Sequence, residues 1–357
     1  MPQHLGRARL VAQGLVTRPY FTPTEALAAF GAMQGQDLPG VLASAALRTP
    51  SNSVDDVVAA LNDGTIVRGY PMRGTVFLMP AADALWITDL CAKPSIRAAM
   101  SRRRELHEGV LDQARELTVA LLDDGGLSRT DLFAGWDAAG ISTADGRGYH
   151  LLFNLIAEGT TCYGPWNGSG QDVVLTSQWL PPGSDLEARF NGDRDAATAE
   201  FLRRYLTTHG PATVRDFGWW TKLTLAQIRR GMALLDGEFE TDGADEPSYW
   251  RPGLLEEVKR LGRATAAPVL LPGFDEFILG YQDRLFAMSD EHHRRLVPGN
   301  NGVFKRSVVI GGKVMGIWTR VGRPGKRTLD VEPFGELSAA TQRRLAKLFD
   351  AFPFVTP

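Results

Sequence analysis

The chain has 357 residues, more than one hydrophobic core normally serves, so we expect two or three domains of roughly 100 residues each. Its 39 lysines and arginines against 41 acids leave a net charge of −2, which excludes a uniformly basic protein. The two cysteines, Cys91 and Cys162, are too few for a disulfide framework or a cysteine-built zinc site. No stretch approaches the ~20 apolar residues of a membrane span or resembles a secretory signal, so we expect a cytoplasmic protein with no membrane partner.

Helix start signals recur along the chain, each followed by a helix that ends at glycine and then by a hairpin pattern. In the first copy, Thr22 and Glu25 predict a capping box, because the hydroxyl and the carboxylate satisfy two unpaired backbone amides. A second box opens a helix predicted over residues 53–64, which ends at glycine because glycine adopts the left-handed cap without steric strain. Residues 65–80 predict two strands around a turn near residues 72–74.

The same order occurs twice more. The second copy has its capping box at Ser128 and a later helix that ends at Gly159. The third copy has boxes at Thr213 and Thr224 and a helix end at Gly237. The hairpins that follow are predicted over residues 160–180 and 238–250.

Two or three helices followed by a two-stranded wing is the winged-helix layout. The chain is therefore predicted to be α+β and mainly helical, with three tandem winged-helix units over residues 1–92, 93–190 and 191–357. The alternative is an irregular α+β protein whose helices happen to end at glycine.

The C-terminal part predicts a hairpin and a closing helix. Residues 302–320 alternate in hydropathy around Gly311 and Gly312, which suit a two-residue turn with positive φ. Residues 329–334 could add a third strand. The last predicted helix, over 338–352, is amphipathic and should close a core. Its apolar residues at helical spacing are Leu345, Leu348, Phe349 and Phe352.

Positive charge is concentrated near this hairpin. The stretch from residue 294 to 327 contains nine cations and no acid, which suits a phosphate backbone. The alternative is a solvated hairpin that faces an acidic surface elsewhere in the protein. The nine are Arg294, Arg295, Lys305, Arg306, Lys313, Arg320, Arg323, Lys326 and Arg327.

Two carboxamides, Gln34 and Gln36, lie one residue apart in the sequence GAMQGQDLPG over residues 31–40. Glutamine is common on helix surfaces, and Gly35 suits a helix end, so the spacing alone favours a structural role.

Other candidate sites have weaker patterns. Asp275 and Glu276 could form an acid/base pair, but adjacent acids in a turn point apart, and Asp283 next to Arg284 suggests local ion pairing, so a structural role is favoured. Tyr281 is a candidate DNA contact, whereas Trp219 and Trp220 are expected in the core. The adjacent His292 and His293 lack metal-ligand spacing, and no phosphate-binding glycine loop occurs.

Six segments together resemble the winged-helix DNA-binding-domain family that includes the AlkZ-type DNA glycosylases. They are RARLVAQGL, GAMQGQDLPG, MRGTVFLMP, GPATVRDFGWWTKL, LLPGFDEFILGYQDR and GNNGVFKRSVVIGGKVMGIW, in the family's order between about residues 7 and 320. The resemblance implies a C-shaped array of three winged helices around a DNA channel, and excision of purines alkylated at N7, including bulky natural-product adducts and cross-links.

The catalytic signature of that family, Gln, an aliphatic residue and Gln, falls on Gln34 and Gln36. Broadly distributed bacterial relatives have Asp at the second position, so Gln36 favours the natural-product self-resistance branch. Gly35 replaces the aliphatic residue, which we expect to alter how tightly the carboxamides are held and which adduct is accepted.

The chemistry explains why carboxamides suffice. An N7-alkylguanine is already cationic, so its glycosidic bond breaks without strong acid assistance, and the enzyme needs mainly a positioned water and oriented dipoles near C1′. We expect Gln34 to hold the water and Gln36 to orient it or stabilise the sugar cation. Asp37 is an auxiliary general-base candidate, although its commoner role is to cap the next turn.

The remaining expectations follow from the same resemblance and from the residues. DNA contacts are expected from Arg73 and from the cations at residues 305–327. Because the first lysine is Lys93, we expect no Schiff-base step and a monofunctional enzyme, the alternative nucleophile being Pro2 after removal of Met1. We expect no metal or organic cofactor. The expected partner is double-stranded DNA that contains alkylated purines, and the protein is expected to associate with the nucleoid when bound to it. The sequence contains no coiled-coil heptads, and we expect a monomer. The alternative function is a non-catalytic winged-helix DNA-binding protein, either a regulator or a damage-sequestering resistance protein; a small-molecule hydrolase is disfavoured.

Overall fold

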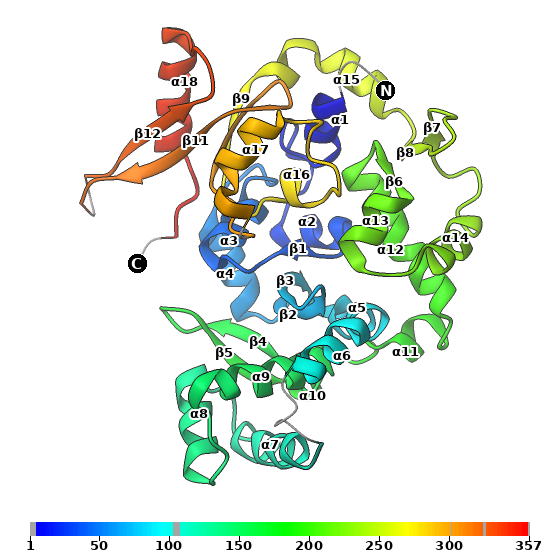
Figure 1. Ribbon diagram of the computed structural model, residues 1–357, viewed down its shortest axis with the longest axis vertical. Helices are drawn as coiled ribbons and strands as arrows, with labels where there is room; N and C mark the ends of the chain where they lie inside the picture. Colours follow the sequence, from blue (N-terminus) through cyan, green and yellow to red (C-terminus); the bar gives the residue numbers. More distant parts are fainter. Residues whose placement is uncertain (1–4, 103–107, 301, 324–325, 356–357) are drawn as a thin grey trace.

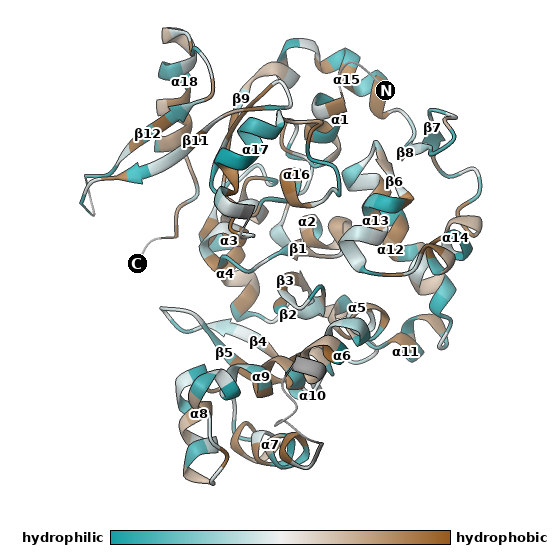
Figure 2. Ribbon diagram, in the orientation of Figure 1, coloured by the Kyte–Doolittle hydropathy of each residue, from teal (hydrophilic) through white to brown (hydrophobic). Residues whose placement is uncertain are grey.

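The computed structural model describes residues 5–102, 108–300, 302–323 and 326–355 (Figure 1). Helices alternate with small antiparallel sheets, which confirms the α+β class. Hydrophobic and polar residues alternate along most helices (Figure 2); in α13 (Val214–Thr221) Phe217 and Trp220 are buried and Arg215 is exposed. No helix of the described residues is long and apolar enough to cross a membrane.

The N-terminal third begins with helices that follow their predicted start signals. The hydroxyl of Thr22 accepts from the backbone N–H of Glu25, whereas the Glu25 carboxylate accepts from the N–H of Phe21 rather than from the cap residue. The elements are α1 (Leu5–Ala12), α2 (Pro23–Phe30), β1 (Met33–Gln34), α3 (Leu38–Ala46), α4 (Val54–Asn62), β2 (Ile66–Met72), β3 (Thr75–Pro80), α5 (Ala84–Cys91) and α6 (Lys93–Arg102).

The hairpins predicted over residues 65–80 and 160–180 are both present and join into one sheet. Its strand order is β1-β3-β2-β4-β5, and Arg68 of β2 lies opposite Tyr163 of β4. The first two hairpins therefore form one continuous sheet, with β1 at its edge. The elements of the middle third are α7 (Glu108–Leu121), α8 (Arg129–Ala138), α9 (Arg147–Ala157), β4 (Thr161–Trp166), β5 (Gln171–Leu175), α10 (Thr176–Trp179) and α11 (Leu186–Phe190).

The next region contains both predicted capping boxes. The hydroxyls of Thr213 and Thr224 each accept from the backbone N–H of the residue three positions later. The side chain of that later residue accepts in return from the backbone N–H of the threonine. The third sheet has the order β6-β8-β7. The elements are α12 (Arg194–His209), β6 (Ala212–Thr213), α13, α14 (Leu225–Ala233), β7 (Glu240–Thr241), β8 (Ser248–Trp250) and α15 (Leu254–Leu261).

The C-terminal sheet confirms the predicted hairpin, the third strand and the closing helix. Gly311 and Gly312 form the turn with φ of 58° and 78°, and the strand order is β12-β11-β10-β9. Phe349 and Phe352 of the closing segment pack edge-on against Trp318, at 6.1 and 4.9 Å between ring centroids. The elements are β9 (Pro268–Leu271), α16 (Glu276–Leu279), α17 (Asp290–Leu296), β10 (Ser307–Ile310), β11 (Lys313–Val321), β12 (Thr328–Pro333) and α18 (Ala339–Asp350). Short 3-10 turns are η1 (Ala81–Asp83), η2 (Ala144–Gly146), η3 (Gly262–Ala266) and η4 (Pro298–Asn300).

The largest core connects segments far apart in the sequence. Trp86 of α5 packs edge-on against Phe201 of α12, and Phe201 contacts Trp220 of α13 at 5.2 Å between centroids. This core fixes α12 and α13 against the β1-β3 edge, where Phe77 meets Trp220 at 6.1 Å. The core role predicted for Trp220 is confirmed, whereas Trp219 is only half-buried.

Candidate functional site

The segment that contains both glutamines runs along the edge of the first sheet. Gln34 ends β1 and pairs with Phe77 of β3, and the N–H of Gly35 donates to the carbonyl of Val76 at 2.8 Å. From the other side, the N–H of Gln34 donates to a carboxylate oxygen of Glu276 at 2.5 Å. The backbone of the segment is thus held by a strand on one face and a buried acid on the other.

The two carboxamides have different roles in this geometry. The Gln34 side chain is 5% exposed, and its Oε1 accepts from the backbone N–H of Gln36 at 2.6 Å. Because the facing atom is an N–H donor, the oxygen and not the amide nitrogen of Gln34 must point toward it. Gln36 is exposed and lines a cavity. The structure therefore presents Gln36 to a ligand and uses the oxygen of Gln34 to shape the turn.

Gly35 allows the close approach of this segment to β3. A Cβ atom at this position would lie 3.2 Å from the backbone nitrogen of Leu78, closer than ordinary van der Waals contact. The carbonyl of Gly35 also accepts from Nη2 of Arg68 at 2.9 Å. Backbone hydrogen bonds thus hold the segment without the aliphatic side chain of the family signature.

Asp37 follows as the N-cap residue of α3, the position expected for its commoner role. Burial raises its pKa above the ordinary range, and the charge of Arg306, the backbone N–H of Gly40 and the charge of Arg68 lower it in part. A carboxylate with a raised pKa is a stronger base than a solvated one.

Asp275 and Glu276 are buried and serve different partners, which confirms the predicted structural role. Asp275 forms an ion pair with Arg48 at 3.0 Å and accepts from the hydroxyl of Ser44. Glu276 is 1% exposed. Its second oxygen accepts from Nε1 of Trp220 at 3.1 Å and lies 3.4 Å from Nε2 of His209.

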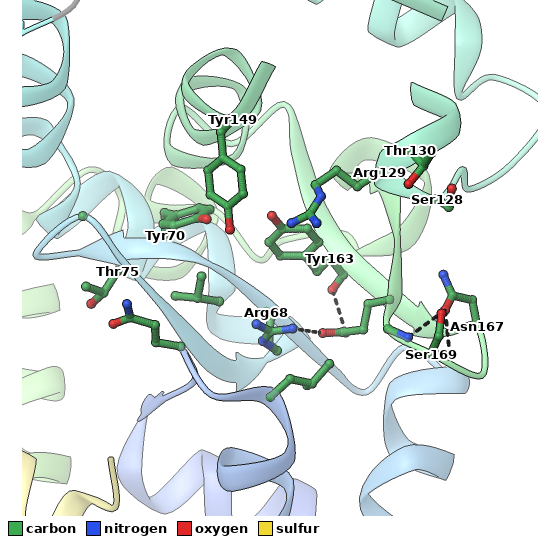
Figure 3. A pocket seen from close by; sticks show the side chains of 16 residues that line it. Arg68, Tyr70, Thr75, Ser128, Arg129, Thr130, Tyr149, Tyr163, Asn167 and Ser169 are labelled. Atoms are coloured by element: carbon green, nitrogen blue, oxygen red, sulfur yellow. Dashed lines mark hydrogen bonds between the residues drawn. The ribbon is translucent and has the colours of Figure 1, made fainter. Parts of the chain in front are cut away.

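A cavity of about 480 Å³ opens beside Gln36 (Figure 3). Three tyrosines and two arginines from β2, β4, α8 and α9 face it, and none of its lining residues is acidic. The guanidinium of Arg68 lies 5.4 Å from the ring centroid of Tyr163, and that of Arg129 lies 5.2 Å from the ring of Tyr149. Arg68 is 8% exposed, and its Nη1 donates to Gln171 at 2.7 Å. The aromatic and basic lining residues are Arg68, Tyr70, Arg129, Tyr149 and Tyr163.

Sequence reasoning missed this cavity. Its tyrosines are scattered between residues 70 and 163, and they meet only because β2 pairs with β4 and α9 packs on both strands. No local signal could have found it.

The basic stretch does not form one continuous patch. Lys313 donates to the carbonyl of Phe286 at 2.5 Å, and Arg295 pairs with Glu332 at 2.8 Å. The turn at Gly312 packs on α1, since a Cβ at Gly6 would lie 2.2 Å from the Gly312 carbonyl oxygen. The Gly311–Gly312 end of the predicted hairpin over residues 302–320 is therefore packed against α1.

The hairpin that projects is β11–β12, visible as the pair of long orange strands in Figure 1. Arg323, Lys326 and Arg327 are exposed in the segment between its strands, and Lys305 is exposed in the segment that precedes β10. At its base, Arg320 and Arg306 line a second cavity of about 290 Å³ together with Pro39 and Gly40 of α3. The base of the projecting hairpin thus lies beside the segment that contains Gln36 and Asp37.

Arg73 occupies the turn between β2 and β3. Its guanidinium lies 5.2 Å from the ring centroid of Phe77 and 4.8 Å from that of Trp219.

Two predictions from the sequence, the DNA contact of Tyr281 and the ion pair of Asp283, are wrong. Tyr281 is fully buried, and its hydroxyl donates to the carbonyl of His209, so it cannot contact DNA. Asp283 forms no ion pair with Arg284 in the described part of the chain; its carboxylate accepts from the N–H of Leu285.

The described residues contain no group of three His, Cys, Asp or Glu side chains that could hold a metal ion. His292 stacks on Phe334 at 4.4 Å between centroids. Pro2, the alternative nucleophile, lies outside the described residues.

Comparisons with known proteins extend over almost the whole chain. The family model described as DNA glycosylase AlkZ-like matches residues 27–352. An interstrand DNA cross-link repair glycosylase of Streptomyces sahachiroi is 25% identical over 301 residues, which cover 81% of this chain and 78% of the relative. The solved structure of the Streptomyces sahachiroi DNA glycosylase AlkZ superposes on this chain with a TM-score of 0.77 at 20% sequence identity. The match covers 98% of this chain and 97% of the AlkZ chain, which shows a shared fold.

Proposed function

The chain belongs to the AlkZ-like DNA glycosylase family, and we propose that it is a monofunctional enzyme of this family. It would hydrolyse the N-glycosidic bond of N7-alkylated guanine with a bulky substituent and leave an abasic site. The observation that supports this most directly is the asymmetry of the two carboxamides. Gln34 fixes the turn, and Gln36 faces an open cavity next to a partly buried acid.

The proposed chemistry needs little proton transfer to the base. N7-alkylguanine leaves as a neutral base, so positive charge grows on the sugar as the bond breaks. The carbonyl dipole of Gln36 would stabilise that charge and orient the attacking water. Asp37, as a carboxylate, would accept the proton from this water. Gln34 and Glu276 act through the backbone as positioning residues.

The positive charge of the cavity beside Gln36 indicates which part of the substrate, the damaged base or its substituent, binds there. A cationic guanine would be repelled by Arg68 and Arg129, since no lining residue is acidic. A neutral, flat substituent suits the faces of Tyr70, Tyr149 and Tyr163. We therefore assign the substituent to this cavity and the damaged base to the edge near Gln36. An open site of this kind does not require full extrusion of the base, which a cross-link would prevent.

DNA would lie along the surface that joins Gln36 to the base of β11–β12. Arg306 and Arg320 line the cavity beside α3, and Arg323, Lys326 and Arg327 would contact phosphates. We further propose that the three helix–hairpin regions, with boundaries near residues 92 and 190, act as tandem winged helices in a C-shaped array around the duplex, and that the protein is a monomer.

Excision assays test the function. Duplexes that contain a single N7-methylguanine or a single N7-benzylguanine are incubated with the protein and then with alkali to cut abasic sites. We expect both to be cut, and Gln36→Ala to slow excision by about 100-fold, the effect typical of losing one preorganised dipole. Tyr149→Ala should reduce the rate on the benzyl adduct by about tenfold through lost stacking, with little change on the methyl adduct.

Absence of excision by the wild-type protein, together with sequence-specific binding of undamaged DNA, would instead indicate a regulator. Full activity of Gln36→Ala would remove the proposed role of that carboxamide. Borohydride added during the reaction tests the monofunctional mechanism: we expect no trapped protein–DNA adduct. A trapped adduct that disappears in Lys222→Gln would overturn it.

A further inference from the structure

Three cations from three distant segments converge on the half-buried ring of Trp219. The guanidinium carbons of Arg73 and Arg284 each lie 4.8 Å from the indole centroid, and Nζ of Lys222 lies 5.6 Å from it. Arg73 comes from the β2–β3 turn, Lys222 follows α13, and Arg284 lies in the segment between α16 and α17.

The cations of this Trp219 cluster carry charge that direct ion pairs do not balance. None of the three cations forms an ion pair with a carboxylate among the residues that the structure describes. Nε of Arg73 is buried and has no hydrogen-bond partner. Burial and the charge of Arg73 lower the pKa of Arg284 to about 10 and lower the pKa of Lys222, so the cations repel one another.

The backbone gives a second, independent observation. Arg73 has a φ of 58° and Lys222 a φ of 65°, in the left-handed region that disfavours residues with a Cβ. Strained conformations of non-glycine residues persist where function or surrounding structure requires them. Glycine would relieve the strain at both positions but would remove the charge.

The Trp219 cluster adjoins the catalytic segment. The guanidinium of Arg73 lies 5.2 Å from the ring of Phe77, which is the register partner of Gln34. Glu276, which holds the N–H of Gln34, contributes to the electrostatic environment of Arg73. An anion bound at the cluster would therefore lie next to the site of glycosidic cleavage.

We propose that Arg73, Lys222 and Arg284, arranged around Trp219, bind a phosphodiester group of the DNA backbone near the damaged nucleotide. A phosphate supplies the missing negative charge, offers acceptors to two guanidiniums and an ammonium, and removes the mutual repulsion. This site differs from the projecting hairpin and from the cavity beside Gln36. The inference rests on the proposed function only in that DNA is the ligand.

The test measures DNA binding, not catalysis. The dissociation constant of the full-length protein for an undamaged duplex is measured by fluorescence anisotropy across a salt series. We expect Lys222→Gln and Arg284→Gln each to weaken binding and to reduce the slope of log K against log salt by up to about 0.9, the value for one lost phosphate contact. Lys222→Arg should retain the wild-type slope.

The matched control is Lys259→Gln, which removes the same charge from an exposed position on α15 and should leave the slope unchanged. Thermal unfolding checks that each variant is folded. Unchanged slopes in folded Lys222→Gln and Arg284→Gln would overturn the proposal, as would an equal fall in Lys259→Gln. If the wild-type protein binds DNA with these slopes but excises neither N7 adduct, the phosphate site stands and the proposed reaction fails.

Discussion

At the scale of single residues, the site depends on how burial changes ordinary side chains. The carboxamide oxygen of Gln34 already accepts from the backbone N–H of Gln36, so we propose that Gln34 positions Gln36 and does not bind the substrate through that oxygen. Glu276 accepts from the backbone of Gln34 and from the indole of Trp220, and it lies 3.4 Å from Nε2 of His209, which makes it an anchor and not a free acid.

Asp37 leads to a prediction about pH. Its pKa is raised by burial, and a general base acts only as the carboxylate. The single-turnover excision rate should therefore fall as the pH is lowered through this raised pKa and level off above it. Asp37→Asn has nearly the same shape, and Asp37 makes no side-chain capping hydrogen bond that it could remove, so it should fold normally, excise about 100-fold more slowly and lose this pH dependence. An unaltered pH profile in Asp37→Asn would assign the titration to another group.

At the scale of elements, pairing between strands decides which hairpins are available to DNA. The hairpins at residues 65–80 and 160–180 pair with each other, which gathers Tyr70, Tyr149 and Tyr163 around one cavity. The Gly311–Gly312 turn packs on α1 and leaves β11–β12 as the projecting hairpin. Three of the cations in the predicted basic stretch, Arg323, Lys326 and Arg327, are thus exposed between β11 and β12.

The contact between α1 and that turn predicts a stability change. A Cβ at Gly6 would meet the carbonyl oxygen of Gly312 at 2.2 Å, so one backbone must move. Gly6→Ala should lower the free energy of unfolding by about 1–3 kcal/mol, the range for overpacked sites. Urea unfolding measures this, with Gly335→Ala as the control because nothing lies within 4 Å of its Cβ position. Equal stability of the two variants would mean that α1 is free to shift.

At the scale of the whole molecule, a chain of net charge −2 binds a polyanion only if its cations are gathered on one surface. Arg306 and Arg320, at the base of β11–β12, lie beside α3, and the Trp219 cluster lies beside β3. Other acids form ion pairs with cations away from this surface, such as Glu238 with Arg203 and Glu158 with Arg115.

This distribution predicts a specific effect of the hairpin loop. The combined variant Arg323→Gln, Lys326→Gln and Arg327→Gln should weaken binding of damaged and undamaged duplexes equally and reduce the salt slope, because phosphate contacts do not distinguish bases. Anisotropy at several salt concentrations measures it. The combined control Arg229→Gln, Lys259→Gln and Arg343→Gln removes the same charge from exposed positions on α14, α15 and α18. If both variants weaken binding alike, net charge alone sets affinity.

The sequence by itself determined the local structure, because the signals involve residues a few positions apart. Two capping boxes and one turn form as predicted, at Thr213, at Thr224 and at Gly311–Gly312. Neither needs a distant partner, because a capping hydroxyl accepts from an N–H three residues later and glycine adopts a positive φ by itself. The Gln34 and Gln36 motif was also visible in the sequence, together with the family that it indicates.

Only the tertiary structure decided how these parts act together. Glu276 lies 242 residues from Gln34, and Arg73, Lys222 and Arg284 meet only because the core of Phe201 and Trp220 fixes α12 and α13 against β3. Such contacts arise from the packing of apolar surfaces, which is not directional and leaves no short-range pattern in the chain. The same packing buries Tyr281 and Gly312, and it leaves Gln36 and the cations Arg323, Lys326 and Arg327 exposed.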